Sequence, residues 1–173
     1  MIIGNFLKKI ELKYKSHYFS GLCFNSPECK KDNIFFAIRG TKIDGNRFIN
    51  HAIKKGAKII ISKQKFEGLK KNILFIKSSN VRKTLSEFAY AIYKDKPKNI
   101  IAVTGTNGKS SIVDFYFQIL KLNKKKVAAI GTLGIKTQNY IKKVSNTTID
   151  PIALSICLNK LKKENINDVI LEA

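Results

Sequence analysis

The stretch "IAVTGTNGKSS" (Ile101–Ser111) constrains the fold of this chain more than any other part of its sequence. An apolar run with strand character enters a loop with two glycines, a lysine and two serines, and an amphipathic segment follows. Glycines allow backbone N–H groups to turn inward, and the start of a helix adds positive partial charge. The stretch therefore predicts an anion cradle between a strand and a helix of an α/β domain.

The pattern around this loop predicts a parallel sheet, because strand and helix signals alternate over residues 96–173. We expect strands over 99–104, 126–134 and 168–173, helices over 110–122 and 150–163, and a polar connection over 135–149. Asp150 and Pro151 are a typical helix start. The apolar residues expected to point inward from the first helix are Ile112, Phe115, Ile119 and Leu122. A parallel sheet needs cover on both faces, so we expect a truncated domain that stops at Ala173.

The pattern of the first half of the chain predicts a separate small α/β domain. We expect strands over 22–26, 33–40, 57–62 and 72–77, and helices over 46–55 and 81–93. Asn46 is the expected N-cap of the first helix, and Gly56 ends it. The charged stretch "KDKPKN" (94–99) is the best domain boundary, which gives domains over 1–95 and 96–173.

Charge and composition narrow the class of protein. The formal net charge is +21, but of 33 basic residues only three are arginine, Arg39, Arg47 and Arg82, so 33 − 3 = 30 are lysine. These lysines are spread along the chain, so we expect a solvated surface that favours anionic ligands and no nucleic-acid partner. No segment has the roughly 20 apolar residues that span a bilayer, and the start does not resemble a signal peptide. We expect a cytoplasmic monomer without membrane contact.

Cysteine and histidine give no sign of a metal site. Cys23, Cys29 and Cys157 are odd in number and form no CxxC pair, which favours three reduced thiols over a disulfide or a metal centre. His17 and His51 lack partners at ligand spacing, and His51 is expected to be a surface residue.

The loop itself matches a short form of the phosphate-binding pattern, Gly105-x-x-Gly108-Lys109-Ser110, since Val103 stands where the strict pattern has glycine. Lys109 would neutralise the β- and γ-phosphates and is the candidate catalytic residue. The Ser110 hydroxyl would ligate Mg²⁺. The predicted ATP-binding residues are Gly105, Thr106, Asn107, Gly108, Lys109, Ser110 and Ser111.

Three segments together resemble the Mur ligase family, the ATP-dependent enzymes that add amino acids to the peptidoglycan precursor. They are "TGTNGKSS" (104–111), "SNTTID" (145–150) and the first-domain segment "FNSPECKKDNIFFAIRGTKIDGNRFINHAIKKGA" (24–57), although Asn25 and Pro27 replace the family's Asp and Arg. Within the family, the Asn-Thr-Thr resembles the motif of the enzymes that add the third, diamino acid residue. The resemblance implies that the UDP-substrate is contacted by Phe24, Ser26, Thr41, Lys42, Ile43, Asn146, Thr147 and Thr148. It also implies that Glu172 helps Ser110 to hold Mg²⁺.

The chemistry that the resemblance implies is ATP-dependent amide formation. A carboxylate of UDP-N-acetylmuramoyl-L-alanyl-D-glutamate would be phosphorylated, and the amine of a diamino acid would displace the phosphate. The Lys-, Ile- and Asn-rich composition is typical of proteins from AT-rich genomes. Meso-diaminopimelate is favoured over L-lysine because bacteria with such genomes more commonly use diaminopimelate. The given chain is expected to have no ligase activity, because the family's closing domain would follow Ala173.

Two alternatives remain open at this point. The first is another ligase with the same loop, either the dipeptide-adding enzyme or a folylpolyglutamate synthetase. The second is a non-catalytic basic P-loop module, whose binding to random DNA would weaken steeply with salt.

Overall fold

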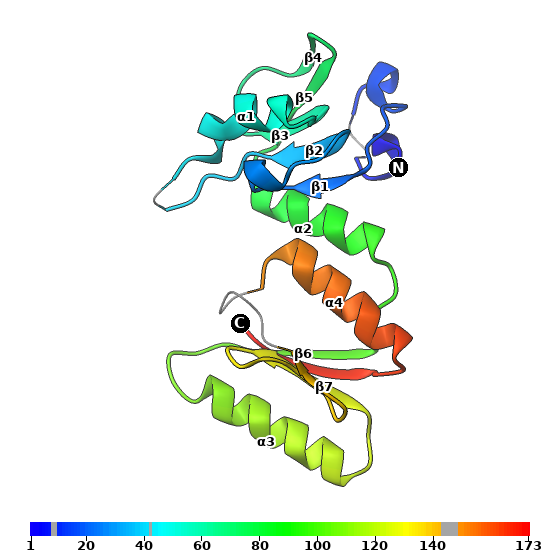
Figure 1. Cartoon of the computed structure of the whole chain (residues 1–173), viewed down its shortest axis with the longest axis vertical. Helices are drawn as coiled ribbons and strands as arrows, with labels where there is room; N and C mark the ends of the chain where they lie inside the picture. Colours follow the sequence, from blue (N-terminus) through cyan, green and yellow to red (C-terminus); the bar gives the residue numbers. More distant parts are fainter. Residues whose placement is uncertain (8–9, 42, 143–148) are drawn as a thin grey trace. The chain divides into compact units, whose positions relative to one another are not determined.

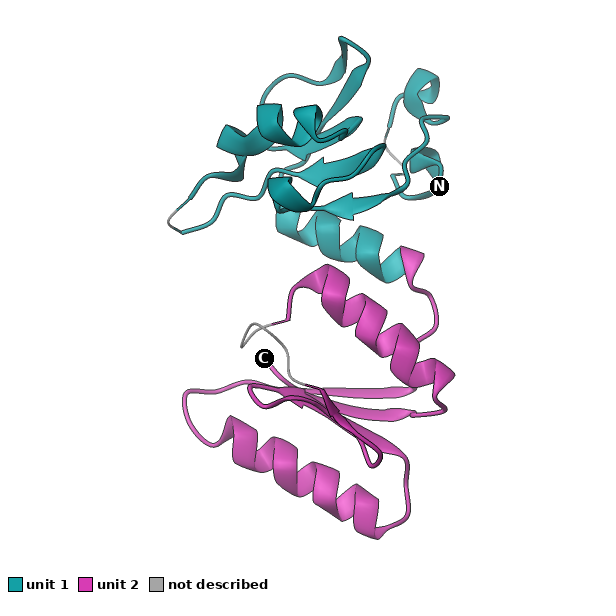
Figure 2. Ribbon diagram, viewed as in Figure 1, with its two compact units in different colours: residues 1–91 teal, residues 92–173 magenta. Residues whose placement is uncertain are grey.

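The computed structural model of the chain describes residues 1–7, 10–41, 43–142 and 149–173. It divides into two compact units, Met1–Ala91 and Ile92–Ala173 (Figure 2). Each unit has its own sheet and its own hydrophobic core. The mixed α/β architecture expected from the sequence is confirmed.

The sheet of unit 1 has the strand order β1-β2-β3-β5-β4. Four strands run parallel, and β4 pairs antiparallel with β5 at one edge. Their bounds are β1 Gly21–Cys23, β2 Asn33–Phe36, β3 Ile59–Ser62, β4 Gly68–Lys70 and β5 Ile73–Lys77. Short 3-10 turns cover Ile3–Asn5, Leu12–Tyr14, Ser26–Glu28 and Gly45–Phe48.

Unit 1 buries both faces of its sheet, because helices α1 (Ile49–Lys54) and α2 (Val81–Ile92) lie on opposite sides of it (Figure 1). All four residues of β2 are buried, as a central strand of a parallel sheet requires. Successive side chains alternate between the faces: Phe35 packs in the cluster that contains Ala52 of α1, whereas the ring of Phe36 meets that of Phe88 of α2 at 5.6 Å.

The sheet of unit 2 has the order β6-β10-β7-β8-β9, in which β6, β10 and β7 are parallel. Its strands are β6 Asn99–Val103, β7 Val127–Gly131, β8 Gly134–Lys136, β9 Ile141–Lys142 and β10 Asp168–Glu172. Helices α3 (Lys109–Leu122) and α4 (Pro151–Lys163) cover its two faces (Figure 1). The Asp150 carboxylate caps α4 by accepting from the N–H groups of Ile152 and Ala153 at 2.9 and 3.0 Å, which confirms the predicted helix start.

The structure corrects four expectations about these elements. The segment after β7 is not an extended strand followed by a polar connection, because the chain turns at Thr132 and Leu133 and returns antiparallel as β8, which then pairs with β9. Strand β4 was missing from the prediction. The helix expected over 46–55 is shorter, since a 3-10 turn precedes Ile49. Asn46 is not the cap: Asp44 caps the 3-10 turn, with its carboxylate accepting from the Asn46 N–H at 2.9 Å, and the N-cap position of α1 itself is Phe48.

The predicted inward face of α3 is also wrong. Ile112, Phe115, Ile119 and Leu122 are 53%, 63%, 58% and 82% exposed. The buried residues are Val113 and Phe117, which pack against Val127, Ala129 and Ile170. Helix α3 therefore lies over β7 and β10, and its other apolar stripe points away from the sheet.

Candidate functional site

The loop between β6 and α3 has the backbone of an anion cradle. Gly105 and Gly108 have φ angles of +153° and +75°, and Gly108 is the N-cap of α3. At Gly108 an L side chain would be strained, which explains the glycine before the lysine. The first-turn N–H groups of α3 have no acceptor within the helix, so they are available to an anion in front of it.

The lysine of the loop is folded back over the cradle. Its Nζ atom donates a hydrogen bond to the Gly105 carbonyl oxygen at 2.6 Å. Lys109 is half-buried, whereas Thr106, Asn107, Ser110 and Ser111 are exposed. The ammonium group is thus held at the loop while the loop remains accessible to a ligand.

Glu172 connects this loop to two neighbouring strands. It is the last residue of β10, in register with Val103, the last residue of β6. Its Oε1 atom accepts from the Ser110 hydroxyl at 2.9 Å. Its Oε2 atom accepts from the backbone N–H and the hydroxyl of Thr132 at 3.1 and 2.9 Å. Ligands of open α/β sheets bind at the carboxyl ends of strands, which is where these groups meet.

The electrostatics keep Glu172 ionised. The Thr132 N–H makes the largest contribution, and the Ser110 and Thr132 hydroxyls and the Lys109 ammonium add to it. Together they hold the pKa of the Glu172 carboxyl below its ordinary value of 4.5. A carboxylate with a serine hydroxyl at hydrogen-bond distance is an oxygen pair of the kind that Mg²⁺ prefers, with phosphate oxygens and water completing the shell. Ser110 and Glu172 therefore fit a magnesium ion.

Two participants in this arrangement were missing from the sequence-based prediction. Thr132 holds the carboxylate, and Gly131 makes room for it, because a Cβ atom on Gly131 would lie 2.7 Å from Oε2 of Glu172. The available signal was the glycine at the end of a buried strand, which marks a close approach of another group.

The residues expected at the uridine nucleotide lie in two loops of unit 1. Phe24 and Ser26 follow β1, and Thr41 and Ile43 follow β2. Because β1 and β2 are parallel neighbours, both loops follow carboxyl ends at the same edge of the sheet. Ser26 is buried, Phe24 is half-buried, and Thr41 and Ile43 are exposed. Lys42, Asn146, Thr147 and Thr148 lie outside the described residues.

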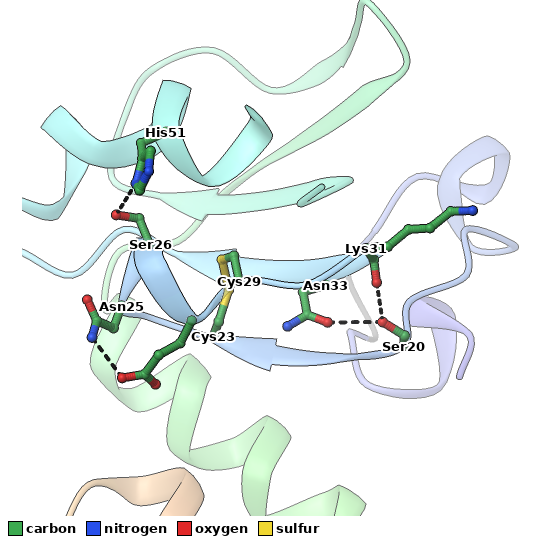
Figure 3. The surroundings of a disulfide bond; sticks show 9 residues. Ser20, Cys23, Asn25, Ser26, Cys29, Lys31, Asn33 and His51 are labelled. Carbon is green, nitrogen blue, oxygen red and sulfur yellow. Dashed lines mark hydrogen bonds between the residues drawn. A yellow bond between two sulfur atoms is a disulfide. The ribbon is translucent and has the colours of Figure 1, made fainter. Parts of the chain in front are cut away.

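The loop after β1 contradicts the expectation of three reduced thiols, since Cys23 and Cys29 form a disulfide (Figure 3). The spacing of the cysteines does not predict this pair, because the 3-10 turn Ser26–Glu28 is what brings the two Cα atoms to a distance of 5.6 Å. His51 also differs from the prediction in part: it is exposed on α1, but its Nδ1 atom lies 2.9 Å from the Ser26 hydroxyl oxygen.

Within the described part of the chain, no group of three or more His, Cys, Asp or Glu side chains is arranged to hold a metal ion. Within the same residues, no helix combines the length and hydrophobicity that crossing a bilayer requires.

Comparison with known proteins gives matches in both units. The model of the Mur ligase family catalytic domain matches residues 18–105, and that of the Mur ligase middle domain matches residues 103–173. The chain is 40% identical over 164 residues to the UDP-N-acetylmuramoyl-L-alanyl-D-glutamate--2,6-diaminopimelate ligase of Rickettsia prowazekii, an alignment that covers 92% of this chain and 34% of the relative. It is 46% identical over 78 residues to the enzyme of the same name from Clostridium tetani, covering 42% and 16%.

Solved structures agree on the fold. A structure of a UDP-N-acetylmuramoyl-L-alanyl-D-glutamate--2,6-diaminopimelate ligase superposes with a TM-score of 0.79 at 24% identity and covers all of this chain and 36% of the other. The MurF ligase of Thermotoga maritima, solved in complex with ADP, gives a TM-score of 0.54 at 22% identity. The chain spans about a third of the length of the relatives that it matches over most of its residues.

Proposed function

The chain belongs to the Mur ligase family, and from this premise we propose that unit 2 binds MgATP and unit 1 binds a uridine nucleotide for ATP-dependent amide formation. The observation that carries the proposal is the convergence of Lys109, Ser110 and Glu172 at the carboxyl ends of β6 and β10. A lysine at a glycine-rich loop, with a hydroxyl and a carboxylate beside it, is what a triphosphate and its metal ion require.

Each residue of the loop has a role in this proposal. Backbone N–H groups from Gly105 to Ser111 surround the phosphates. Lys109 exchanges the Gly105 carbonyl oxygen for the β- and γ-phosphate oxygens and neutralises the charge that develops during transfer. Ser110 and Glu172 hold Mg²⁺, which polarises the γ-phosphate when bound. Thr132 positions the Glu172 carboxylate for that task.

We propose UDP-N-acetylmuramoyl-L-alanyl-D-glutamate and diaminopimelate, as its meso isomer, as the substrates, because the names of the relatives given above contain the first compound and 2,6-diaminopimelate. Phe24, Ser26, Thr41, Lys42 and Ile43 would bind the uridine end. Asn146, Thr147 and Thr148 would hold the muramoyl-peptide. The γ-phosphoryl group passes to the peptide carboxylate to give an acyl phosphate, and the diamino acid amine then displaces phosphate. L-lysine remains the alternative amine.

The full reaction belongs to the longer ligases. Since the chain spans about a third of their length, we expect binding without amide formation from these 173 residues alone. We place it in the cytoplasm as a monomer, where nucleotide-linked precursors and ATP occur together.

Ligand-induced stabilisation tests the proposal. Ligands that bind only the folded state raise the melting temperature by mass action. We expect UDP-N-acetylmuramoyl-L-alanyl-D-glutamate and MgATP each to raise it, and Lys109→Ala to abolish the MgATP effect alone. Lys121→Ala, in the last turn of the same helix α3, serves as the matched control and should respond to MgATP like the parent chain.

The outcomes bear on the alternatives. Stabilisation by MgATP without any by the uridine nucleotide would keep the phosphate loop and reopen the other ligases and the non-catalytic P-loop module. Stabilisation by neither ligand, with a circular dichroism spectrum of a folded α/β protein, would overturn the proposal.

A further inference from the structure

The Cys23–Cys29 disulfide closes the loop that carries two of the proposed nucleotide contacts. The two cysteines are six residues apart (Figure 3). The segment between them contains Phe24 and Ser26. Cys23 ends β1, whereas Cys29 follows the 3-10 turn Ser26–Glu28. The sheet therefore holds Cys23, and the disulfide holds Cys29 against Cys23, so both ends of the loop are fixed.

Weaker contacts complete the arrangement within the loop. The Asn25 amide donates to the Glu28 carboxylate at 2.8 Å, and the Ser26 hydroxyl oxygen lies 2.9 Å from Nδ1 of His51. The Asn25–Glu28 contact is exposed to solvent, where single hydrogen bonds contribute little net stability. The covalent bond is thus the strongest constraint on where Phe24 and Ser26 lie.

The surroundings of the two sulfur atoms tolerate both redox states. Cys23 and Cys29 are 4% and 6% exposed and belong to the apolar cluster that includes Phe35, Ala52 and Ile60. A free cysteine behaves as a small hydrophobic residue, so two thiols would still suit this cluster. Reduction would then leave the core of unit 1 folded while the loop between the cysteines gains conformational freedom.

We propose that Cys23 and Cys29 form a thiol-redox modification site that regulates uridine-nucleotide binding, with the disulfide form binding more tightly than the dithiol form. The proposal rests on the nucleotide site proposed above for unit 1. The physical basis is preorganisation, because a loop that is already ordered loses less conformational entropy when the ligand binds.

The chemistry is thiol–disulfide exchange with a small-molecule disulfide such as oxidised glutathione. One cysteine thiolate attacks the glutathione disulfide and releases one glutathione thiol. The second cysteine attacks the mixed disulfide and releases the other. The two protein thiols lose two electrons and two protons in total, and one disulfide becomes two glutathione thiols. An excess of reduced glutathione reverses both steps.

The third cysteine is chemically separate from this pair. Cys157 lies in α4 of unit 2, and burial raises the pKa of its thiol to about 11. It therefore lies outside the loop whose order the exchange changes.

Calorimetric titration of the 173-residue chain with UDP-N-acetylmuramoyl-L-alanyl-D-glutamate tests the proposal. The chain is equilibrated with oxidised or with reduced glutathione, and mass spectrometry counts its free thiols. We expect Kd to rise at least about fivefold on reduction. Cys23→Ser/Cys29→Ser should show the weaker affinity in both buffers, and Cys157→Ser should behave like the parent chain in both.

Hydrogen exchange of the amides from Phe24 to Glu28 provides a readout that needs no ligand. We expect faster exchange in the dithiol form while the amides of β2 and β3 stay protected. A measurable and equal Kd in both redox states would overturn the regulation and leave the proposed function intact. Absence of binding in either state would overturn the proposed function and the regulation with it.

Discussion

At the scale of single residues, Glu172 determines how the phosphate loop is connected to the sheet. Its carboxylate accepts hydrogen bonds from Ser110 and from two groups of Thr132. Because these partners lower its pKa, the ionised form stabilises the folded state. This contribution is complete above the ordinary pKa of 4.5 and is lost as the pH falls through the lowered pKa.

We predict that Glu172→Gln destabilises the chain at neutral pH and has no effect in strong acid. The loss should not exceed about 1 kcal/mol, since the carboxylate lies near solvent and its interactions are screened. Denaturant unfolding of parent and variant from about pH 7 to about pH 2 measures it. Glu67→Gln, at an exposed position, controls for the loss of one negative charge. A difference between parent and Glu172→Gln that persists at the acid end would contradict the argument.

At the scale of elements, α3 carries two apolar faces, and only one of them meets the sheet. Phe117 is 2% exposed and packs with Val113 in the core, whereas Phe115, two positions away, is 63% exposed. The Lys136 ammonium lies 4.6 Å from the centre of the Phe117 ring, which adds a cation–π contact on the buried side.

These two phenylalanines form a matched pair for mutation. We predict that Phe117→Ala lowers the free energy of unfolding of unit 2 by about 3–5 kcal/mol, because it leaves a cavity in the core of that unit. Phe115→Ala should change it by less than about 0.5 kcal/mol. Urea denaturation followed by circular dichroism compares them directly, and similar losses for both variants would show that the stripe on the far side of α3 is packed.

The same helix shows what the sequence can and cannot predict. The strand, loop and helix around Lys109 and the cap at Asp150 follow from local signals, and the structure contains them. Local spacing could not decide between Phe115 and Phe117, because that choice depends on where α3 crosses β7 and β10. The contacts of Thr132 and the pairing of Cys23 with Cys29 depend equally on long-range geometry, which a periodic pattern does not encode.

At the scale of the whole molecule, the two units each have their own core. A chain built from separately cored units need not unfold in one cooperative step. The proposed ligands also divide between the units, with the uridine nucleotide in unit 1 and MgATP in unit 2.

We therefore predict two thermal transitions in differential scanning calorimetry, each shifted by one ligand. MgATP at about 100 times its Kd stabilises the unit that binds it by about 2.7 kcal/mol, which corresponds to a shift of roughly ten degrees or more for a unit of this size. Lys109→Ala should remove that shift and leave the response to the uridine nucleotide. A single transition that both ligands move together would contradict independent units.

The exposed stripe of α3, formed by Ile112, Phe115, Ile119 and Leu122, has a further consequence for the chain in concentrated solution. Contiguous apolar surface of this kind attracts other copies at short range. The net charge of +21 opposes that attraction at longer range, because two copies repel each other before their apolar surfaces can touch. Salt shortens the reach of the repulsion and leaves the attraction in place. The α3 stripe thus adds to the attraction that the lysines oppose, and ionic strength determines which of the two prevails.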